Sequence, residues 1–480
     1  MFKLWLKFQE NMENQWALYS QIKNEMIEIV NKINDFYPKP GRILDAPINE
    51  ATYNQMVQLF SYEYLKCFVH IQKFAATNDI YTKQLYSRLI STSHILEDFL
   101  DFHGAKNNRK WYYFRELTAT VRHLSLAGYS QKHILNRLPC YLIDNKELFL
   151  QECNKSKSFI TTTLTALSKA ILNEAKELEL QIPNKIEWEF FPRLSYGENL
   201  EADIDEELDD LEKFQQKKNY VKIASDFLNI VKAFERHDFD EPYSFLELKK
   251  KVPVKINEVE IRKFDMVVHN LQSYFDSYVT YGTGVVYDLK LKKLRGFFSI
   301  ILHLLKMMGR LLHFYERHIL DVGIKNINKR VRNRLATIVD TEQLLDRIIN
   351  FGLYYICFFL NSGKELAKEI LNENVEQGTI TVNVPVKQGF HMRPSLLVAK
   401  IVEYYGADVS LCAGDSCFDA SSVLDIQWAG GKIQKEKISQ VKFKGDTRAL
   451  NDIKILADVN YGEDSIGRGV PLPGALSYLR

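Results

Sequence analysis

The sequence predicts a multidomain protein in which a large all-α N-terminal region precedes a small C-terminal α+β domain. Two patterns lead to this prediction. Over residues 1–372, apolar residues recur three and four positions apart in stretch after stretch, which is typical of amphipathic helices. Over 379–385, apolar and polar residues alternate instead, as in a strand with one buried face. A chain of 480 residues is long enough for two to three domains.

The first half of the helical region divides into helices at short polar or glycine-containing loops. A helix is predicted over residues 5–33, and the Pro-Lys-Pro-Gly segment 38–41 ends it. A loop is predicted at 103–108, where a glycine and two asparagines gather. The other helices of this half are expected at 49–76, 80–102, 109–127, 130–138, 146–153 and 157–181.

A break at residues 182–200, which contains two prolines and a glycine, predicts a boundary between two helical subdomains, 1–182 and 198–372. The segment 198–212 carries nine acidic residues, yet its apolar residues keep helical spacing. This pattern indicates an acidic amphipathic helix. A solvated helix face explains it more simply than a docking site for a basic partner. Three more long helices are expected at 254–280, 284–319 and 341–372.

Residues 377–460 are predicted to form the α+β domain. Strand-like alternation and helix-like spacing follow each other there in the order βαββαβα. Glycine-containing segments separate most of these stretches. The strands and helices are expected, in order, at 379–385, 394–405, 407–412, 415–419, 421–428, 437–443 and 446–458.

The turns of this domain are predicted from residue type. Gly406 is expected to cap the first helix, Gly414 with Asp415 to form a tight hairpin turn, and Asp446 to be the N-cap of the last helix. Gly430-Gly431 is expected to be a flexible bend. The remaining residues, 461–480, are rich in glycine and proline and are predicted to be a mobile or surface-draped tail.

Composition excludes several classes of protein. A net charge of +2 gives no general attraction for nucleic acid or anionic lipid. No signal peptide is recognisable, and the most apolar helices, near 297–314 and 348–360, are interrupted by charge or too short for a membrane span. A cytoplasmic protein without membrane insertion is therefore expected. The six cysteines have no metal-ligand spacing and are expected to be free thiols: Cys67, Cys140, Cys153, Cys357, Cys412 and Cys417.

The most informative residue is His391, in the turn between the first strand and first helix of the α+β domain. Gly389 frees the backbone for this turn, and Pro394 fits an early helix position. A helix start presents unpaired N–H groups and partial positive charge, so it attracts anions. His391 can therefore carry a phosphoryl group that the amides of Met392 and Arg393 and the Arg393 guanidinium hold. From spacing alone, a histidine that only caps the helix is equally possible.

The segment Gly389–Ser395, which reads Gly-Phe-His-Met-Arg-Pro-Ser, resembles the Gly-Leu-His-x-Arg-Pro-Ala active-site motif of HPr, the histidine phosphocarrier of the bacterial phosphotransferase system. A second segment, Ala420–Gln427, is similar to the family's Ala-Lys-Ser-Leu-Phe-x-Leu-Gln helix. The resemblance covers 377–460, about a sixth of the chain. It implies an open-faced sandwich, with helices on one face of a four-stranded antiparallel sheet.

The resemblance also implies roles for individual residues. His391 is the phosphorylated histidine, Arg393 is its phosphate partner, and Ser422 is a regulatory phosphorylation site, with Ser421 as the alternative. The expected partners are an Enzyme I-like phosphoryl donor, an acceptor protein and a serine kinase, and no cofactor is implied. The side chains expected to dock partners around His391 are Met392, Leu396, Lys400, Val423 and Leu424.

The helical region offers one further candidate site. Lys306, Arg310, His313 and Arg317 follow helical spacing and could bind a phosphometabolite, a nucleotide or a phosphorylated partner. A solvated basic face is the simpler interpretation. The ten histidines of this region show no metal-binding spacing, so no metal site is expected.

Three functions follow from these observations. The first is a phosphocarrier domain fused to a regulatory or partner-binding helical region. The second is an interaction protein that uses the α+β domain only for docking. The third is an enzyme whose helical region acts on a phosphorylated substrate.

Overall fold

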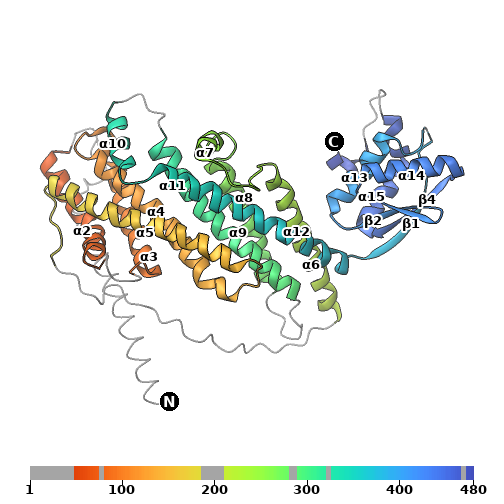
Figure 1. Cartoon of the computed structure of the whole chain (residues 1–480), viewed down its shortest axis with the longest axis horizontal. Coiled ribbons are helices and arrows are strands. Elements are labelled where there is room, and N and C mark those ends of the chain that lie inside the picture. The colour runs from red at the N-terminus through yellow and green to blue at the C-terminus, as the bar shows by residue number, and fades with distance from the viewer. Residues whose placement is uncertain are drawn as a thin grey trace, which may run out of the picture. The chain divides into compact units, whose positions relative to one another are not determined.

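The computed structural model describes residues 48–74, 80–184, 210–279, 289–320, 326–386, 388–465 and 472–479. The predicted helix 5–33, most of the boundary 182–200 and most of the acidic segment 198–212 lie outside these ranges. The described chain is an all-α region followed by a small domain with a four-stranded antiparallel sheet (Figure 1). The predicted combination of an all-α region with an α+β domain is therefore confirmed.

Contacts divide the chain into two compact units. The first contains the described residues within 1–80, 88–122 and 165–191, and the second contains the rest. The first helices are, in chain order, α2 (Glu50–Phe74), α3 (Lys83–Phe102), the 3-10 turn Ala105–Asn107, α4 (Tyr112–Arg137), the 3-10 turn Leu138–Cys140 and α5 (Lys146–Glu177). The long helices α3, α4 and α5 contribute residues to both units. Two pairs of predicted helices, 109–127 with 130–138 and 146–153 with 157–181, are thus single helices.

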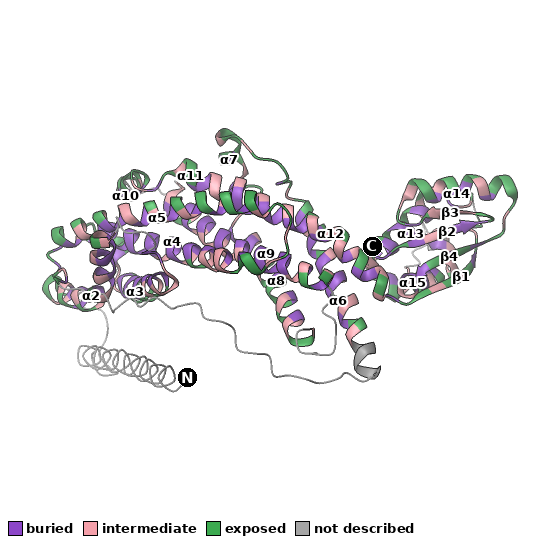
Figure 2. Ribbon diagram, turned by 60° about the horizontal axis from the view of Figure 1, so that its bottom comes forward, coloured by how far each residue is buried: buried purple, intermediate pink, exposed green. Residues whose placement is uncertain are grey.

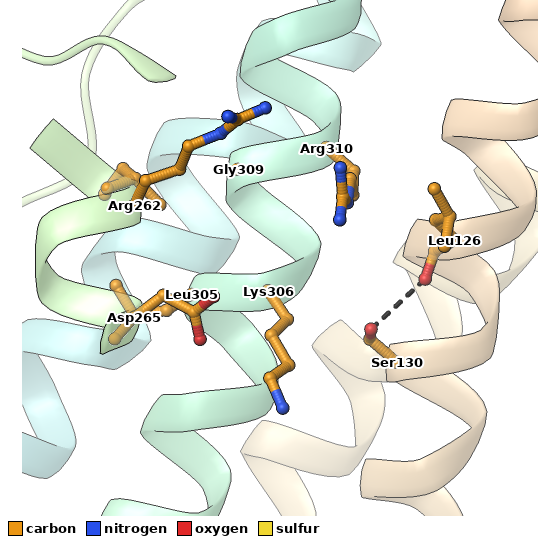
Figure 3. A pocket seen from close by; sticks show the side chains of 9 residues that line it. Leu126, Ser130, Arg262, Asp265, Leu305, Lys306, Gly309 and Arg310 are labelled. Carbon is orange, nitrogen blue, oxygen red and sulfur yellow. Dashed lines mark hydrogen bonds between the residues drawn. The ribbon is translucent and has the colours of Figure 1, made fainter. Parts of the chain in front are cut away.

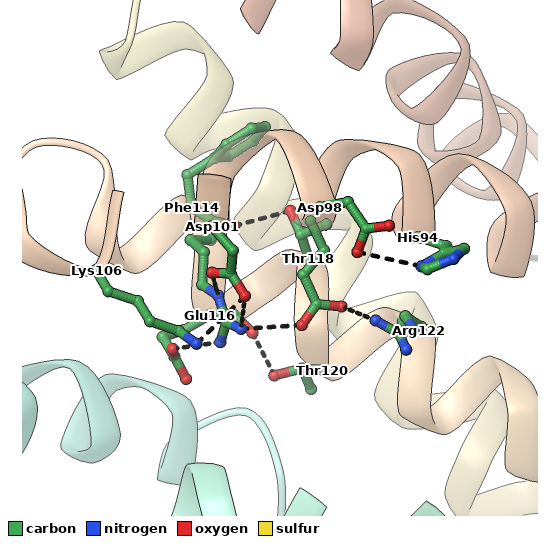
Figure 4. A network of polar contacts seen from close by, with 11 residues as sticks. His94, Asp98, Asp101, Lys106, Phe114, Glu116, Thr118, Thr120 and Arg122 are labelled. Carbon is green, nitrogen blue, oxygen red and sulfur yellow. Dashed lines mark hydrogen bonds and ion pairs between the residues drawn. The ribbon is translucent and has the colours of Figure 1, made fainter. Parts of the chain in front are cut away.

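The first unit is built around aromatic contacts and one buried ionic network. Tyr53 of α2 packs on Trp111, with ring centroids 5.0 Å apart. One turn after Trp111, Arg115 of α4 is almost fully buried and pairs with three carboxylates. Its N–H groups donate to Glu97 at 3.0 Å, to Asp101 at 2.6 Å and to Glu116 at 2.8 Å. Figure 4 shows this network, with two of the carboxylates, Asp101 and Glu116, labelled. A buried guanidinium with several carboxylate acceptors satisfies the donors that burial removes from water.

The second unit contains the later helices. In chain order they are α6 (Asp210–Glu235), α7 (Phe245–Lys251), α8 (Glu258–Tyr278), α9 (Leu289–Phe314), the π-helical turn Tyr315–Ile319, α10 (Asn326–Ala336), α11 (Thr341–Asp346), the π-helical turn Arg347–Leu353 and α12 (Tyr354–Asn374). Helix α9 packs on α8 and α12, which in turn pack on α6. Most residues of α9 are buried, as Figure 2 shows. Two helical stretches of the described chain, Leu289–Ile319 and Thr341–Asn374, are long and apolar enough to span a membrane, with 72% and 67% of the apolar window buried within the protein.

The C-terminal domain has the predicted element order. It consists of β1 (Gln377–Asn383), α13 (Met392–Tyr405), β2 (Val409–Ala413), β3 (Ser416–Asp419), α14 (Val423–Glu436), β4 (Gln440–Asp446) and α15 (Thr447–Asp458). The antiparallel strands lie in the order β1-β4-β2-β3. Helix α15 packs on β1 and β4, α14 packs on β2 and β3, and α13 contacts both helices. Along β4, Val441 and Phe443 are buried whereas Lys442 and Lys444 are exposed, so the helices cover one face of the sheet.

The turns of this domain follow the predictions with one exception. Gly406 ends α13 with a φ of 76°, and Asp446 is the N-cap of α15, accepting from the Arg448 amide at 2.9 Å. The expected bend at Gly430-Gly431 is wrong, because both glycines lie inside α14. Burial of Ile426 and Ile433 on one helix face stabilises the helix through the glycines despite their low helix propensity.

Two further expectations change. Cys412 and Cys417 are not free thiols, because they face each other across β2 and β3, with Cα atoms 4.1 Å apart, and form a disulfide. The predicted tail is also partly ordered. Leu476 and Leu479 belong to the core of the C-terminal domain, and Tyr478 stacks on Tyr404.

Candidate functional site

His391 lies at the start of α13, as predicted. It is the N-cap residue in extended conformation, but its side chain makes no capping hydrogen bond. Its backbone N–H donates to the carbonyl of Gly389 at 2.9 Å, and Gly389 has a φ of 60°. The imidazole is about one third exposed. A histidine that only caps the helix is therefore excluded in this structure, and the ring is available for another role.

The residues beside His391 hold its turn in place. Phe390 is buried and contacts Tyr461, with ring centroids 5.2 Å apart. The hydroxyl of Ser395 donates to the Phe390 carbonyl at 3.1 Å and lies 2.9 Å from the His391 carbonyl. On the other side, the backbone of Phe390 lies against Gly430 of α14, where a β-carbon would come within 3.0 Å of the Phe390 carbonyl oxygen. The turn is thus fixed by core packing on both sides.

The ring of His391 is oriented by Glu463, which the sequence did not identify. The Nε2 atom of His391 contacts a carboxylate oxygen of Glu463, whose side chain is 7% exposed. The other oxygen, Oε2, is buried and has no hydrogen-bond partner among the described residues. A carboxylate that accepts the proton of Nε2 leaves Nδ1 as the unprotonated, nucleophilic nitrogen. No spacing rule connects residues 72 positions apart, so only the fold could bring them together.

The predicted phosphate partners lie next to His391 in the first turn of α13. The amides of Met392 and Arg393 open the helix, where no carbonyl one turn earlier is available to them. The Arg393 side chain is half-buried and makes no hydrogen bond or ion pair with any residue in the described ranges. Both amides and the guanidinium can therefore serve an anion bound at Nδ1.

Exposed apolar side chains surround this turn. Met392 and Leu396 on α13 are 61% and 41% exposed, and Leu424 and Trp428 on α14 are 66% and 75% exposed. The Gln427 amide lies 3.9 Å from the Met392 sulfur, so the exposed side of α14 adjoins the start of α13. We call Met392, Leu396, Leu424 and Trp428 the apolar patch. Trp428 was missed, although it stands one helical turn after Leu424.

The remaining predicted residues have different positions. Val423 is only partly exposed and packs against the domain core, so it adds little to the patch. Lys400 is exposed farther along α13. Ser422 is half-buried at the N-cap of α14 and its hydroxyl accepts from the Asp425 amide at 3.2 Å, whereas Ser421 is exposed and bonds Asp419 at 2.8 Å.

The basic residues predicted on one helix stripe do not act as a single face. Lys306 and Arg310 line a pocket of about 190 Å³ together with Arg262 and Asp265 of α8 (Figure 3). Burial raises the pKa of Asp265, although Lys306 and Arg310 partly counter this effect. Arg317, by contrast, is exposed. The pocket is therefore lined by three cationic side chains and one carboxylate.

The fourth member of the stripe, His313, belongs to a different group. Its ring nitrogen and those of His123 and His318 lie within 4.8 Å of one another. No metal site was expected here, because the histidines lack a recognised metal-ligand spacing in the sequence. The fold brings His123 of α4 next to the end of α9, so the prediction from spacing missed a candidate ligand set.

Comparison with known proteins found no matching family model, no similar curated protein and no similar solved structure.

Proposed function

We propose that the C-terminal domain is a histidine phosphocarrier of the HPr type, which accepts a phosphoryl group on His391 and passes it to a partner protein. One observation carries the proposal. His391 begins α13 without a side-chain capping hydrogen bond, and its Nε2 contacts Glu463, which leaves Nδ1 as the nitrogen that can accept a phosphoryl group. The order and pairing of the strands and the helices on one sheet face support the HPr-like fold.

The transfer step uses only groups that are present at this turn. The Nδ1 lone pair forms a bond to phosphorus while the bond from phosphorus to the donor nitrogen breaks and returns its electron pair to the donor. Arg393 and the amides of Met392 and Arg393 balance the charge of the phosphoryl oxygens. Glu463 keeps accepting from Nε2–H and stabilises the positive ring of the adduct. The reverse step delivers the group to an acceptor.

Access to His391 also supports a carrier. The contacts between α6 and this domain lie at the far end of α13, where Lys232 pairs with Glu403 at 2.8 Å. Asn372 of α12 also bonds this end, since its amide donates to Asp408 at 2.7 Å. Met392 and Leu396, at the start of α13, are exposed among the described residues and can meet a partner. An Enzyme I-like donor, an acceptor protein and a serine kinase acting on Ser422 are the proposed partners, and the cytoplasm is the proposed location.

The test is phosphorylation of the full chain with phosphoenolpyruvate and the general donor enzyme of the phosphotransferase system. Wild-type protein should acquire one acid-labile phosphate per chain, and His391→Ala should acquire none. His94→Ala is a matched control, because His94 is exposed and also lies beside a carboxylate, Asp98, at 3.4 Å, but within a helix. The control should be labelled like the wild type. No label on the wild type would leave docking alone as the role of the domain.

The pocket of the helical region favours a second function, binding of a small anionic ligand. Arg262, Lys306 and Arg310 line this pocket from two helices. Titration of the full chain with inorganic pyrophosphate should give saturable binding that Lys306→Gln weakens at least tenfold, whereas Lys292→Gln on the same helix should not change it. Equal affinity for pyrophosphate in the two variants would show that the pocket is not the anion-binding site.

A further inference from the structure

We infer that His123, His313 and His318 form a binding site for one divalent transition-metal ion, with Zn²⁺ as the preferred ion. The inference is independent of His391 and of the proposed carrier function. It rests on the meeting of three imidazoles from two helices inside the second unit, on the irregular backbone that brings His318 into place, and on a buried carboxylate that lies next to His313.

The three rings converge although they are far apart in sequence. His123 lies on α4 and is 3% exposed, His313 is in the last turn of α9, and His318 is 5% exposed on the π-helical turn that follows. One ligand nitrogen from each ring lies within 4.8 Å of the other two. Ring centroids are 4.3 Å apart for His123 and His313, and 5.7 Å apart for His123 and His318.

The π-helical turn explains why two histidines of one continuous helix can face the same point. Residues five positions apart in an α-helix are separated by about 500° of rotation and do not lie on one face. The segment Tyr315–Ile319 is wound more widely, and the Leu320 amide donates to the Tyr315 carbonyl at 2.7 Å. Such π-helical insertions are uncommon and frequently occur at functional sites. Here the insertion rotates His318 toward His313 and His123.

A carboxylate lies beside one of the rings. An oxygen of Glu258, which is 5% exposed at the start of α8, lies 2.9 Å from Nδ1 of His313, but the two atoms are not aligned for a hydrogen bond. A rotation of the imidazole on metal binding would let Nδ1–H donate to this oxygen and would leave Nε2 of His313 as the ligand atom. The Glu258 amide in turn donates to the side chain of Glu316 at 2.9 Å, which links α8 to the π-helical turn. In metal sites, the second ring nitrogen of a histidine ligand usually donates to a carboxylate, a backbone carbonyl or water.

The charges around the group are compatible with a cation. Arg262 would repel a metal ion, but its guanidinium is paired with the same Glu258 carboxylate. Glu316 adds a second carboxylate nearby, and the three imidazoles are neutral ligands once deprotonated. Three imidazoles suit Zn²⁺ and also Co²⁺ or Ni²⁺, whereas Mg²⁺ and Ca²⁺ prefer oxygen. Binding requires the rings to turn until their nitrogens are about 3.3 Å apart, the edge of a tetrahedron with a Zn–N distance of about 2.0 Å.

A site of three histidines leaves a fourth position for water or a ligand. The pocket lined by Lys306 and Arg310 is a separate site, because none of the three histidines lines it.

Metal binding can be measured directly on the full chain, purified without a histidine tag and stripped with a chelator. Equilibrium dialysis against Zn²⁺ should give one bound ion per chain. Replacement by Co²⁺ should give the intense visible absorption of a four-coordinate ion with nitrogen ligands. His313→Gln should lose that ion and that absorption. Glu258→Gln should retain the ion with affinity reduced about 10- to 100-fold, as expected when a supporting carboxylate is lost.

His303→Gln is the matched control. His303 lies on the same helix as His313 and stacks on His133 of α4 at 3.9 Å, so it is also a histidine from the same two helices, but it belongs to a pair. This variant should bind Zn²⁺ like the wild type. The inference is overturned if wild type binds less than one ion per chain, or if His303→Gln and His313→Gln lose binding equally while circular dichroism shows both folded.

Discussion

Gly430 and Gly431 are neighbours in α14 that differ in what an added methyl group would meet, and they provide a sharp test of how the His391 turn is held. At Gly430, a β-carbon would lie 3.0 Å from the Phe390 carbonyl oxygen and 3.3 Å from the Phe390 β-carbon. At Gly431, nothing lies within 4 Å. Alanine at either position therefore changes the same helix, but only Gly430→Ala pushes on the residue before His391.

The magnitudes follow from two opposing effects. Replacing a helical glycine by alanine stabilises a helix by about 1 kcal/mol, and this gain applies to both variants. Overpacking against a fixed backbone costs about 1–3 kcal/mol, and this cost applies only to Gly430→Ala. We expect Gly431→Ala to be more stable than wild type by about 1 kcal/mol. The free energy of unfolding of Gly430→Ala should lie about 1–3 kcal/mol below that of Gly431→Ala.

Native-state hydrogen exchange is the suitable assay, because it reports the C-terminal domain separately within a chain of several domains. The exchange free energies of amides in α14 and β4 would be compared among wild type and the two variants. Phosphorylation of His391 would be followed in parallel. Gly430→Ala should slow it because a displaced turn changes the position of His391 relative to the first turn of α13, whereas Gly431→Ala should leave the rate unchanged.

Equal exchange free energies in the two variants would refute the reasoning, because the higher helix propensity of alanine would then explain the stability of both variants without any contact with Phe390. A slower phosphorylation of Gly431→Ala than of Gly430→Ala would also contradict it, because Gly431 does not contact the turn.

Three further predictions concern the buried ionic network, the apolar patch and two stacked histidines. Arg115→Met leaves Glu97 and Glu116 buried without their shared cation, so it should destabilise the first unit by about 3–5 kcal/mol, measured by hydrogen exchange of α4. Lys110→Met, which breaks the exposed pair with Glu50, should cost no more than about 1 kcal/mol. A similar loss of stability in both variants would argue against the network. Trp428→Ala should raise the KM for the phosphoryl donor without changing the stability of the domain, because the indole is 75% exposed. Leu246→Ser, at an equally exposed apolar residue outside the domain, should leave the KM unchanged. An unchanged KM for Trp428→Ala would show that the apolar patch does not dock the donor. Burial and nearby cations lower the pKa of His133 to about 4 and of His303 to about 3, so the unfolded chain, with an ordinary histidine pKa of about 6.5, binds protons first as the pH falls. The contribution of these rings to the free energy of unfolding is therefore fully present above pH 6.5 and decreases as the pH falls toward 3. His303→Gln should lose less stability between pH 7 and pH 5 than wild type. An identical pH dependence of stability in the two proteins would contradict the prediction.

The local chemistry of the His391 turn could be anticipated from the sequence, because it depends on neighbours in the chain. The strand pattern at 379–385 is followed by a glycine, a histidine and a proline within the six residues from Gly389 to Pro394. This combination predicts a strand-to-helix turn whose first helical amides have no backbone partner. Gly406 and Asp446 were equally predictable, since caps and turns depend on the conformational range and hydrogen-bonding groups of one or two residues.

The tertiary structure decided what depends on residues that are distant in sequence. Gly430 was expected to bend the chain, but packing of α14 on the sheet outweighs the propensity of a glycine, and the missing side chain instead admits the backbone of Phe390. Glu463 orients His391 and Cys412 joins Cys417 only because the sheet and the final turns place them together. The three histidines of the helical region show the same limit, since helical periodicity describes one helix at a time. Which faces meet is determined by side-chain packing between helices, a sum of many weak contacts that no short segment encodes.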